Sequence, residues 1–310
     1  MTVQTPSVSV VIPVYNDPEG VRLTLESVSN QTYPNKDYEV VVVNNNSDDG
    51  DDTQGAIDEY HEQYPERVRP VFESEQGRWH ALDAGIEAAR GDVLAFVDAE
   101  MTVEVDWLAS VIEALEETGA DYLGTTVESY PPDGKETTAT LFDRLTLFRM
   151  GEYFEESYFV GAGCTTVRRE VIDAVGGFST DVRYMADNEF GKRIHAAGFS
   201  QHFEPSIVMR HPARASVGAH WKKNVKVGRG SRELARAYPE YFDASSPFRL
   251  RGFLPPHPGR FVDRLRERMA ERDIDSGDRS LREWAGLYSL GCVQKYARTA
   301  GSLYEYLTGE

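Results

Sequence analysis

The chain has 310 residues and a net charge of −18, with 51 acidic against 33 basic side chains. This length suits one large α/β domain with an appendage, or two domains. The two cysteines, Cys164 and Cys292, match no metal or redox spacing, and no apolar run approaches the roughly 20 residues that span a bilayer. The N-terminal segment lacks the features of a signal peptide. These properties argue against a disulfide-rich secreted domain and a transmembrane protein, and they predict a cytoplasmic one.

Charge is unevenly distributed along the chain. Residues 1–205 contain 14 Lys and Arg against 39 Asp and Glu, a net charge of −25, whereas residues 206–272 contain 15 against 6, a net charge of +9. Only seven residues are lysine. Acidic, lysine-poor surfaces favour solubility in high salt, so we expect a salt-adapted source. The basic segment predicts an anionic partner near it.

Apolar runs alternate with helical patterns in the first half of the chain. Strands are predicted at 8–14, 38–43, 68–73 and 92–98, and helices at about 18–30, 53–64, 78–90 and 104–118. This alternation is typical of βαβ units and a parallel sheet. Because ligands bind beyond the carboxyl ends of parallel strands, we expect residues 13–16, 44–49 and 98–100 to line one crevice.

The pattern changes after about residue 120. Further strands are predicted at 122–130, 157–169 and 202–211, and further helices at 138–155, 186–199, 215–237, 259–271 and 279–307. The helices at 215–237 and 259–271 are basic and amphipathic, and a Pro-rich stretch separates them. The last hundred residues therefore form a basic, mainly helical extension.

Two carboxylates follow the apolar run Val93-Leu94-Ala95-Phe96-Val97, in the sequence Asp98-Ala99-Glu100. Paired acids beyond a strand end are often solvated loop residues. At the ligand edge of a parallel sheet they also suit a hard divalent cation that bridges a diphosphate.

Five blocks of sequence carry a family resemblance. They are SVVIPVYN (9–16), VVVNNNSDDG (41–50), ALDAGIEAARGDVLAFVDAE (81–100), VGAGCTTVRREVIDAVGGFST (160–180) and ADNEFGKRIHAAGF (186–199). In order and spacing they resemble family 2 glycosyltransferases of the GT-A fold. The resemblance implies an α/β fold with a Rossmann-like, mostly parallel central sheet flanked by helices. It places a GT-A domain at 1–212, with a nucleotide-sugar half at about 1–120 and an acceptor half at about 121–212, followed by the helical C-terminal extension at 213–310.

The resemblance also implies a cofactor and a donor. In the family an Asp-X-Asp signature binds Mn²⁺ or Mg²⁺, which neutralises the diphosphate of a UDP- or GDP-sugar, and here that signature reads Asp98-Ala99-Glu100. The Glu is a departure, so we rank Asp98 above Glu100 as a metal ligand. His211 resembles positions that supply a third ligand or contact the diphosphate in some GT-A enzymes, although a lone histidine is often structural.

Several residues are candidates for nucleotide contact. Asn44 and Asn45 stand where the family often has acids that contact the base; the alternative is an Asx-type turn. Tyr15 can pack against a base or be a core residue. Arg78 can bind phosphate or be a solvated surface arginine. The nucleotide-binding candidates are Pro13, Tyr15, Asn16, Asn44, Asn45, Arg78 and Asp98.

The acceptor half supplies the candidate catalytic base. Met185-Ala186-Asp187-Asn188-Glu189 resembles the family's Glu-Asp block at a helix N-terminus, which aligns Asp187 with the base and replaces the preceding Glu by Ala186. On the residues alone, Asp187 is also a good helix N-cap. Glu189 is a weaker candidate for acceptor contact. The Gln-X-X-Arg-Trp motif of processive relatives is absent after this helix, which favours an inverting transferase that adds one sugar.

The basic C-terminal extension bears on whether the acceptor is associated with a membrane. Trp221, Lys222, Lys223, Lys226, Arg229, Arg232 and Arg236 share one predicted helix. Basic helices with apolar neighbours can lie on an anionic membrane surface, close over the phosphates of the donor, or pack on the acidic domain. We therefore expect a cytoplasmic or peripheral membrane enzyme whose acceptor is dolichol-linked or otherwise lipid-linked, in a surface-glycan or protein-glycosylation pathway.

Other classes of function are weighed against this one. A nucleotidyltransferase also uses an Asp-bound metal, but it normally has a Gly-rich phosphate loop after its first strand, where this chain has Pro13-Val14-Tyr15-Asn16. The missing glycines also argue against a dinucleotide-dependent dehydrogenase. A non-catalytic, degenerate GT-A scaffold is a further alternative. Overall acidity argues against a nucleic-acid partner.

Overall fold

The computed structural model describes residues 7–243, 246–275, 277 and 279–309. The chain divides into two compact units. The first contains the residues up to Glu128 together with Phe148–His211, and the second contains Ser129–Leu147 and the chain from Pro212 onward. The stretch 129–147, which we expected within the acceptor half, therefore belongs to the same unit as the C-terminal helices.

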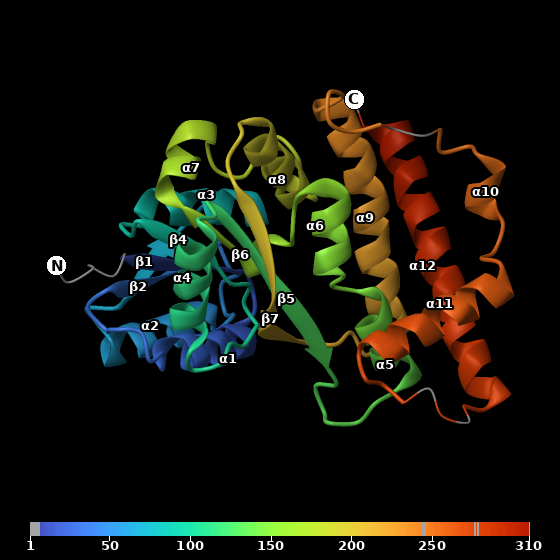
Figure 1. The fold of residues 1–310 in the computed structure, drawn as a ribbon, viewed down its shortest axis with the longest axis horizontal. Helices are drawn as coiled ribbons and strands as arrows, with labels where there is room; N and C mark the ends of the chain where they lie inside the picture. The colour runs from blue at the N-terminus through green and yellow to red at the C-terminus, as the bar shows by residue number, and fades with distance from the viewer. Residues whose placement is uncertain (1–6, 244–245, 276, 278, 310) are drawn as a thin grey trace. The chain divides into compact units, whose positions relative to one another are not determined.

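A seven-stranded sheet forms the centre of the first unit (Figure 1). Its strands follow the order β3-β2-β1-β4-β6-β5-β7. β1, β2, β3 and β4 are parallel, whereas β6 is antiparallel to both β4 and β5. The strands are β1 (Val8–Val14), β2 (Tyr38–Asn44), β3 (Val68–Phe72), β4 (Val93–Phe96), β5 (Tyr122–Tyr130), β6 (Thr165–Arg168) and β7 (Gln201–Pro212).

The apolar runs of the sequence explain the central strands. Every residue of β4 is buried, and β1 is buried at all positions except Pro13. Helices therefore cover both faces, with α1 and α2 on one side and α3 on the other (Figure 1). The helices of this unit are α1 (Pro18–Ser29), α2 (Thr53–Gln63), α3 (Arg78–Ala88), α4 (Trp107–Thr118), α6 (Met150–Ser157), α7 (Arg169–Val175) and α8 (Ala186–Ala196).

Two predicted elements between residues 138 and 169 are wrong. The expected helix at 138–155 is two helices, α5 (Thr138–Thr146) and α6, with Phe148 between them in the left-handed region at φ 50°. The expected strand at 157–169 contains the end of α6, a 3-10 turn (Ala162–Cys164) and only the short strand β6. Tyr158, at φ 60°, ends α6. The left-handed residues break patterns that look continuous in the sequence.

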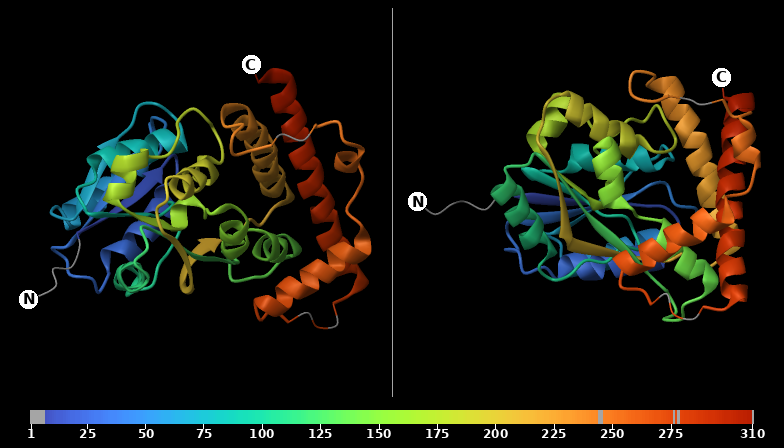
Figure 2. Two further views of the ribbon diagram at one scale, coloured as in Figure 1. Left: turned by 45° about the horizontal axis from the view of Figure 1, so that its top comes forward. Right: turned by 45° about the vertical axis from the view of Figure 1, so that its right-hand side comes forward.

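Helices make up most of the second unit. They are α5, α9 (Val217–Ala237), α10 (Leu250–Phe253), α11 (Pro258–Glu271) and α12 (Leu281–Thr308). α9 and α12 lie side by side (Figure 2), because Gly228 faces the Arg298 carbonyl and Gly301 faces the Val225 carbonyl where a Cβ atom would clash. A separate apolar core joins α5, α11 and α12 through Leu141, Phe142, Leu145, Leu265, Met269, Leu287 and Leu290. Among the described residues, no helix has both the length and the hydropathy of a membrane span.

Candidate active site

The end of β4 delivers Asp98 to the carboxyl edge of the sheet. Its backbone carbonyl accepts hydrogen bonds from the Met101 amide at 3.1 Å and the Thr24 hydroxyl at 3.3 Å. The amide of Glu100, a residue in the left-handed region at φ 73°, donates to the Gly20 carbonyl at 3.1 Å. The loop after β4 is therefore fixed against α1, with the Asp98 side chain 26% exposed.

Arg78 and Gly163 lie against the Asp98 carboxylate. Arg78, the first residue of α3, forms an ion pair with Asp98 at 2.6 Å, and its own side chain is 41% exposed. A Cβ atom at Gly163 would lie 2.6 Å from the Asp98 carboxyl carbon, so a larger residue there would displace the Asp98 side chain. We predicted Arg78 near phosphate; the structure adds its direct pairing with the candidate metal ligand. Gly163 was missed, although a glycine between small residues signals a close backbone approach.

Asp187 reaches the same turn from α8. Its Oδ2 accepts a hydrogen bond from the Ala162 amide at 3.3 Å, and its Oδ1 accepts one from the Asn188 amide at 3.0 Å. The helix begins at Ala186 with Met185 as N-cap, so Asp187 lies in the first turn and the N-cap interpretation is wrong. The turn Gly161–Cys164 therefore lies against both carboxylates, Asp98 at Gly163 and Asp187 at the Ala162 amide.

Besides burial, the two carboxylates both affect the pKa of the Cys164 thiol. Burial raises the pKa of this thiol, and the negative charges of Asp98 and Asp187 raise it further. The thiol donates to the Gly161 carbonyl at 3.1 Å. Burial therefore favours the neutral thiol of Cys164 over the thiolate, which is the nucleophilic form.

Glu100 and His211 form a second pair beside the β4 loop. An isolated β-bridge between Thr102 and Arg210 sets the end of β7 against this loop, and His211 Nε2 lies 3.0 Å from Glu100 Oε1. The His211 ring is 8% exposed and packs on Phe148, with ring centroids 4.9 Å apart. Two of the three predicted metal ligands are thus in contact.

Nearby carboxylates make this edge electronegative. Burial raises the pKa of the Asp17 carboxyl, a hydrogen bond from the Gly20 amide opposes that rise, and the Glu100 charge adds to it. Within the described ranges, no group of three or more His, Cys, Asp and Glu side chains is positioned to hold a metal ion alone. Mg²⁺ and Mn²⁺ prefer oxygen ligands, and Mg²⁺ commonly takes one or two carboxylates plus substrate phosphates. Asp98 and Glu100 fit a cation of that kind.

The loops after β1 and β2 are joined to each other. The Asn16 amide donates to Ser47 Oγ at 3.0 Å, Asn16 Nδ2 donates to Asp48 Oδ2 at 2.6 Å, and the Asp48 amide donates to Asn16 Oδ1 at 2.8 Å. Tyr15 is 46% exposed, so the core interpretation is wrong. Pro13 is half-buried within β1. Residues 13–16 and 44–49 therefore lie close together, and the crevice that we expect them to share with residues 98–100 stays a prediction.

Asn44 and Asn45 are each 4% exposed and engage protein partners. Asn44 Oδ1 accepts from the Ser47 amide at 3.1 Å, and its Nδ2 donates to Gln54 Oε1 at 2.8 Å. Asn45 Oδ1 accepts from the Gly77 amide at 2.7 Å. The Asn44–Ser47 bond is local, as the Asx-turn alternative requires, whereas the bonds to Gln54 and Gly77 connect the loop after β2 to α2 and to the start of α3.

Glu189, the weaker candidate for acceptor contact, is 1% exposed. Arg193 binds it through Nε at 2.6 Å and Nη2 at 2.9 Å. The same arginine donates to the Gly177 carbonyl at 2.8 Å. Glu189 therefore orders the segment between α7 and α8, and its carboxylate is buried against Arg193.

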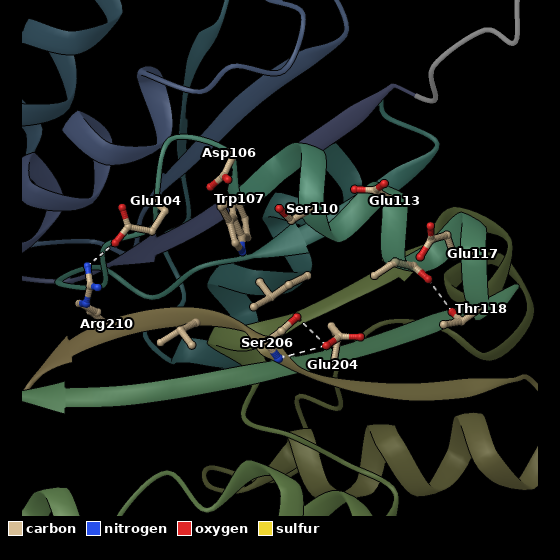
Figure 3. A pocket seen from close by; sticks show the side chains of 13 residues that line it. Glu104, Asp106, Trp107, Ser110, Glu113, Glu117, Thr118, Glu204, Ser206 and Arg210 are labelled. Carbon is tan, nitrogen blue, oxygen red and sulfur yellow. Dashed lines mark hydrogen bonds and ion pairs between the residues drawn. The ribbon is translucent and has the colours of Figure 1, made fainter. Parts of the chain in front are cut away.

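A pocket of about 340 Å³ lies between α4 and β7 (Figure 3). Arg210, which lines it, precedes His211 in β7, and successive strand residues face opposite sides of a sheet. Arg210 is paired with Glu104, and the other charged lining residues are acidic. A negatively charged lining disfavours a diphosphate, so this pocket is not the donor site. Its carboxylates belong to Glu104, Asp106, Glu113, Glu117 and Glu204.

Comparison with known proteins agrees with this geometry. The family model described as "Glycosyl transferase family 2" matches residues 9–176, which include β1, β4 and the turn at 161–164. The chain belongs to glycosyl transferase family 2. It is therefore a glycosyltransferase, and the α/β GT-A fold predicted from the sequence is confirmed.

Named relatives of this family 2 glycosyltransferase include archaeal proteins. Glycosyltransferase AglE of Haloferax volcanii is 34% identical over 261 residues, covering 83% of this chain and 84% of AglE. A Methanococcus voltae protein is 24% identical over 234 residues, covering 71% of each chain. It is named dolichyl N-acetyl-alpha-D-glucosaminyl phosphate 3-beta-D-2,3-diacetamido-2,3-dideoxy-beta-D-glucuronosyltransferase.

Solved structures share the fold. Mannosyltransferase PcManGT of Pyrobaculum calidifontis, in complex with GDP-Man and Mn²⁺, aligns with a TM-score of 0.65 at 21% identity, covering 99% of this chain and 89% of that one. S. aureus TarS 1–349, in complex with UDP-GlcNAc, aligns with a TM-score of 0.55 at 15% identity, covering 97% and 92%. At these identities the likeness concerns the fold.

Proposed function

We propose that this glycosyltransferase moves one sugar, with inversion, from a UDP- or GDP-sugar to a hydroxyl or phosphate of a lipid-linked acceptor. The observation that carries the proposal is the turn at 161–164, which lies against the Asp98 carboxyl group at Gly163 and donates a hydrogen bond to Asp187 from the Ala162 amide. The nucleotide sugar is held by the half at about 1–120, and the acceptor by the half at about 121–212.

Asp98 and Arg78 serve the departing diphosphate. Asp98 would hold the divalent cation, with Glu100 and its partner His211 as the further candidate ligands, and the cation would supply positive charge to the diphosphate when bound. Arg78, partly exposed at the start of α3, is within reach of the same anion because it already pairs with Asp98. A planar guanidinium suits a phosphate group. The Asn44 and Asn45 hydrogen bonds hold the loop that meets the base.

Asp187 acts as the general base. It takes the proton from the acceptor hydroxyl while that oxygen bonds to the anomeric carbon and the bond from that carbon to the diphosphate oxygen breaks. A phosphate acceptor is already ionised and needs no base. The hydrogen bonds from the Ala162 and Asn188 amides stabilise the ionised carboxylate, which keeps it ready to accept a proton.

The lipid-linked acceptor is supported by the relatives and by a missing motif. The Methanococcus voltae relative is named for a dolichyl phosphate sugar. The processive Gln-X-X-Arg-Trp motif is absent after α8. Addition of one sugar to a lipid carrier agrees with both observations.

Calorimetry tests the donor site directly. We would titrate UDP, GDP and dTDP into the full chain in high salt, with Mn²⁺, with Mg²⁺ and without metal, and repeat the titrations with Asp98→Ala. We expect metal-dependent binding of one nucleotide and its loss in the variant. Absence of binding to all three nucleotides would favour the degenerate scaffold. Release of pyrophosphate from a nucleoside triphosphate and a sugar phosphate would instead identify a nucleotidyltransferase.

A further inference from the structure

The basic residues of α9 are partly engaged within the second unit. Arg229 Nε and Arg236 Nη2 bind the two oxygens of the Glu305 carboxylate at 3.0 and 3.1 Å. That carboxylate is completely buried. These two arginines stabilise the α9–α12 pair, so the charge that they contribute to the surface is partly neutralised. The sequence alone had suggested this helix as a membrane-binding surface.

A different segment displays positive charge and apolar side chains together. No acidic residue lies between Asp243 and Asp263, although 51 of the 310 residues are acidic. Within this interval lies the sequence Phe248-Arg249-Leu250-Arg251-Gly252-Phe253-Leu254. Neither Arg249 nor Arg251 has an ion-pair partner in the part of the chain that the structure describes.

The apolar side chains of this segment are exposed. Leu250 is 73% exposed, Phe253 47% and Phe248 57%. Leu250 and Phe253 are three residues apart in α10, so they lie on the same side of the turn. Phe248 packs edge-on against Tyr306 of α12, with ring centroids 5.4 Å apart. We call this set the arginine–aromatic patch: Phe248, Arg249, Leu250, Arg251, Phe253, Leu254 and Tyr306.

The backbone beneath the patch is anchored to α12, beside which α10 lies (Figures 1 and 2). The Thr299 hydroxyl donates to the Gly252 carbonyl at 3.1 Å, and the Tyr288 hydroxyl donates to the Pro256 carbonyl at 2.7 Å. Gly252 allows this approach, because a Cβ atom there would lie 3.3 Å from Thr299 Oγ1. The main chain is held while the exposed side chains point away from the core.

We propose that the arginine–aromatic patch docks this enzyme on an anionic lipid bilayer. Apolar side chains enter the boundary between headgroups and acyl chains, and neighbouring guanidinium groups bind lipid phosphates. Tyr306 suits that boundary, because its ring is apolar and its hydroxyl is polar. Residues 1–205, with a net charge of −25, are repelled by an anionic surface, so charge complementarity favours the basic segment 206–272. Within that segment the patch joins Arg249 and Arg251 to exposed apolar side chains. This inference rests on the proposed lipid-linked acceptor. It adds the surface through which the enzyme binds the membrane that contains that acceptor.

Sedimentation with vesicles tests the patch without donor, acceptor or metal, so its failure and the failure of the proposed function can be told apart. The full chain would be mixed with equimolar phosphatidylcholine and phosphatidylglycerol vesicles, or with pure phosphatidylcholine vesicles, at low and high salt. We expect binding to the anionic vesicles. Arg249→Glu with Arg251→Glu should weaken it about tenfold or more at low salt. Leu250→Ser with Phe253→Ser should weaken it at both salt concentrations, because salt screens only the charges.

Matched variants control for general changes of charge and hydropathy. Leu281→Ser removes an 86% exposed apolar side chain of the same unit outside the patch and should leave vesicle binding unchanged. Lys222→Glu with Lys226→Glu changes the exposed charge of α9 and should weaken binding less than the arginine pair does. Circular dichroism would verify the fold of each variant. Equal binding by folded patch variants and wild type, binding lost only with the lysine pair, or no binding by wild type would each overturn the proposal.

Discussion

The two units use their carboxylates differently. In the second unit, the Glu305 side chain is completely buried between Arg229 and Arg236, and the Asp143 side chain is 2% exposed beside Arg214 and His220. Such carboxylates join helices that are distant in sequence. Their oxygens face protein groups and are inaccessible to a ligand.

The carboxylates at the sheet edge of the first unit remain accessible. The Asp98 side chain is 26% exposed and that of Glu100 is 44% exposed, although each has a basic partner within 3.0 Å. Glu189, buried against Arg193 in the same unit, resembles the structural carboxylates instead. Exposure and position at a strand or helix end, rather than pairing itself, therefore separate the candidate catalytic carboxylates from the structural ones.

The largest effect should follow from removing the proposed base. Asp187→Asn keeps the shape of the side chain but cannot take a proton, so transfer to a hydroxyl acceptor should fall by about 10²–10⁴-fold. Nucleotide binding and the unfolding midpoint should change little. Single-turnover transfer, calorimetry and urea unfolding measure the three properties. Transfer by the variant at the wild-type rate would show that Asp187 is not the base. Exposure and position at a helix end would then not identify a catalytic carboxylate.

A structural carboxylate should show the opposite behaviour. Glu305→Gln removes the buried negative charge that binds Arg229 and Arg236, and we expect the free energy of unfolding to fall by about 3 kcal/mol. Glu240→Gln, in the exposed turn after α9, should change it by less than about 0.5 kcal/mol. Urea unfolding of both variants tests this prediction. A stability loss no larger for Glu305→Gln than for Glu240→Gln would show that burial does not identify structural carboxylates here.

Sequence patterns predicted the first four strands and their helices to within a few residues because these elements have strong apolar periodicity. The ends of β1 and β4 also identified Asn16 and Asp98, since parallel strands bring their carboxyl ends to one edge. The α8 block identified Asp187 through a family resemblance, because on the residues alone the N-cap interpretation was favoured.

The contacts that organise the site could not be predicted from patterns. The pairing of Arg78 with Asp98 and the fit of Gly163 against that carboxylate depend on tertiary approach between segments far apart in sequence. The break at Phe148 depends on a left-handed backbone at a residue that rarely adopts it. The role of Glu189 was hidden because its partner, Arg193, looked like an ordinary helix residue.

A methyl group at Gly163 should perturb the candidate site more than the fold. The added Cβ of Gly163→Ala meets the Asp98 carboxyl group, so we expect metal-dependent nucleotide binding to weaken by about 1–3 kcal/mol. Gly161→Ala is the matched control, because its nearest neighbour is the flexible end of Met150 at 3.4 Å. Calorimetry compares the two variants. Similar affinities would mean that the turn can move away from Asp98 at little cost.

The smallest effect concerns Cys164, whose pKa is raised first by burial and then by Asp98 and Asp187. The reactive species is the thiolate, so Cys164 should resist an aromatic disulfide reagent from neutral to mildly alkaline pH and react only after unfolding. Cys292, which is only partly buried, should react first. Asp98→Asn removes one negative charge and should lower the Cys164 pKa slightly, but burial should keep the thiol unreactive. Rapid modification of Cys164 in the folded wild type would show that the turn at 161–164 opens to solvent, so that its contacts with Asp98 and Asp187 would not be permanent.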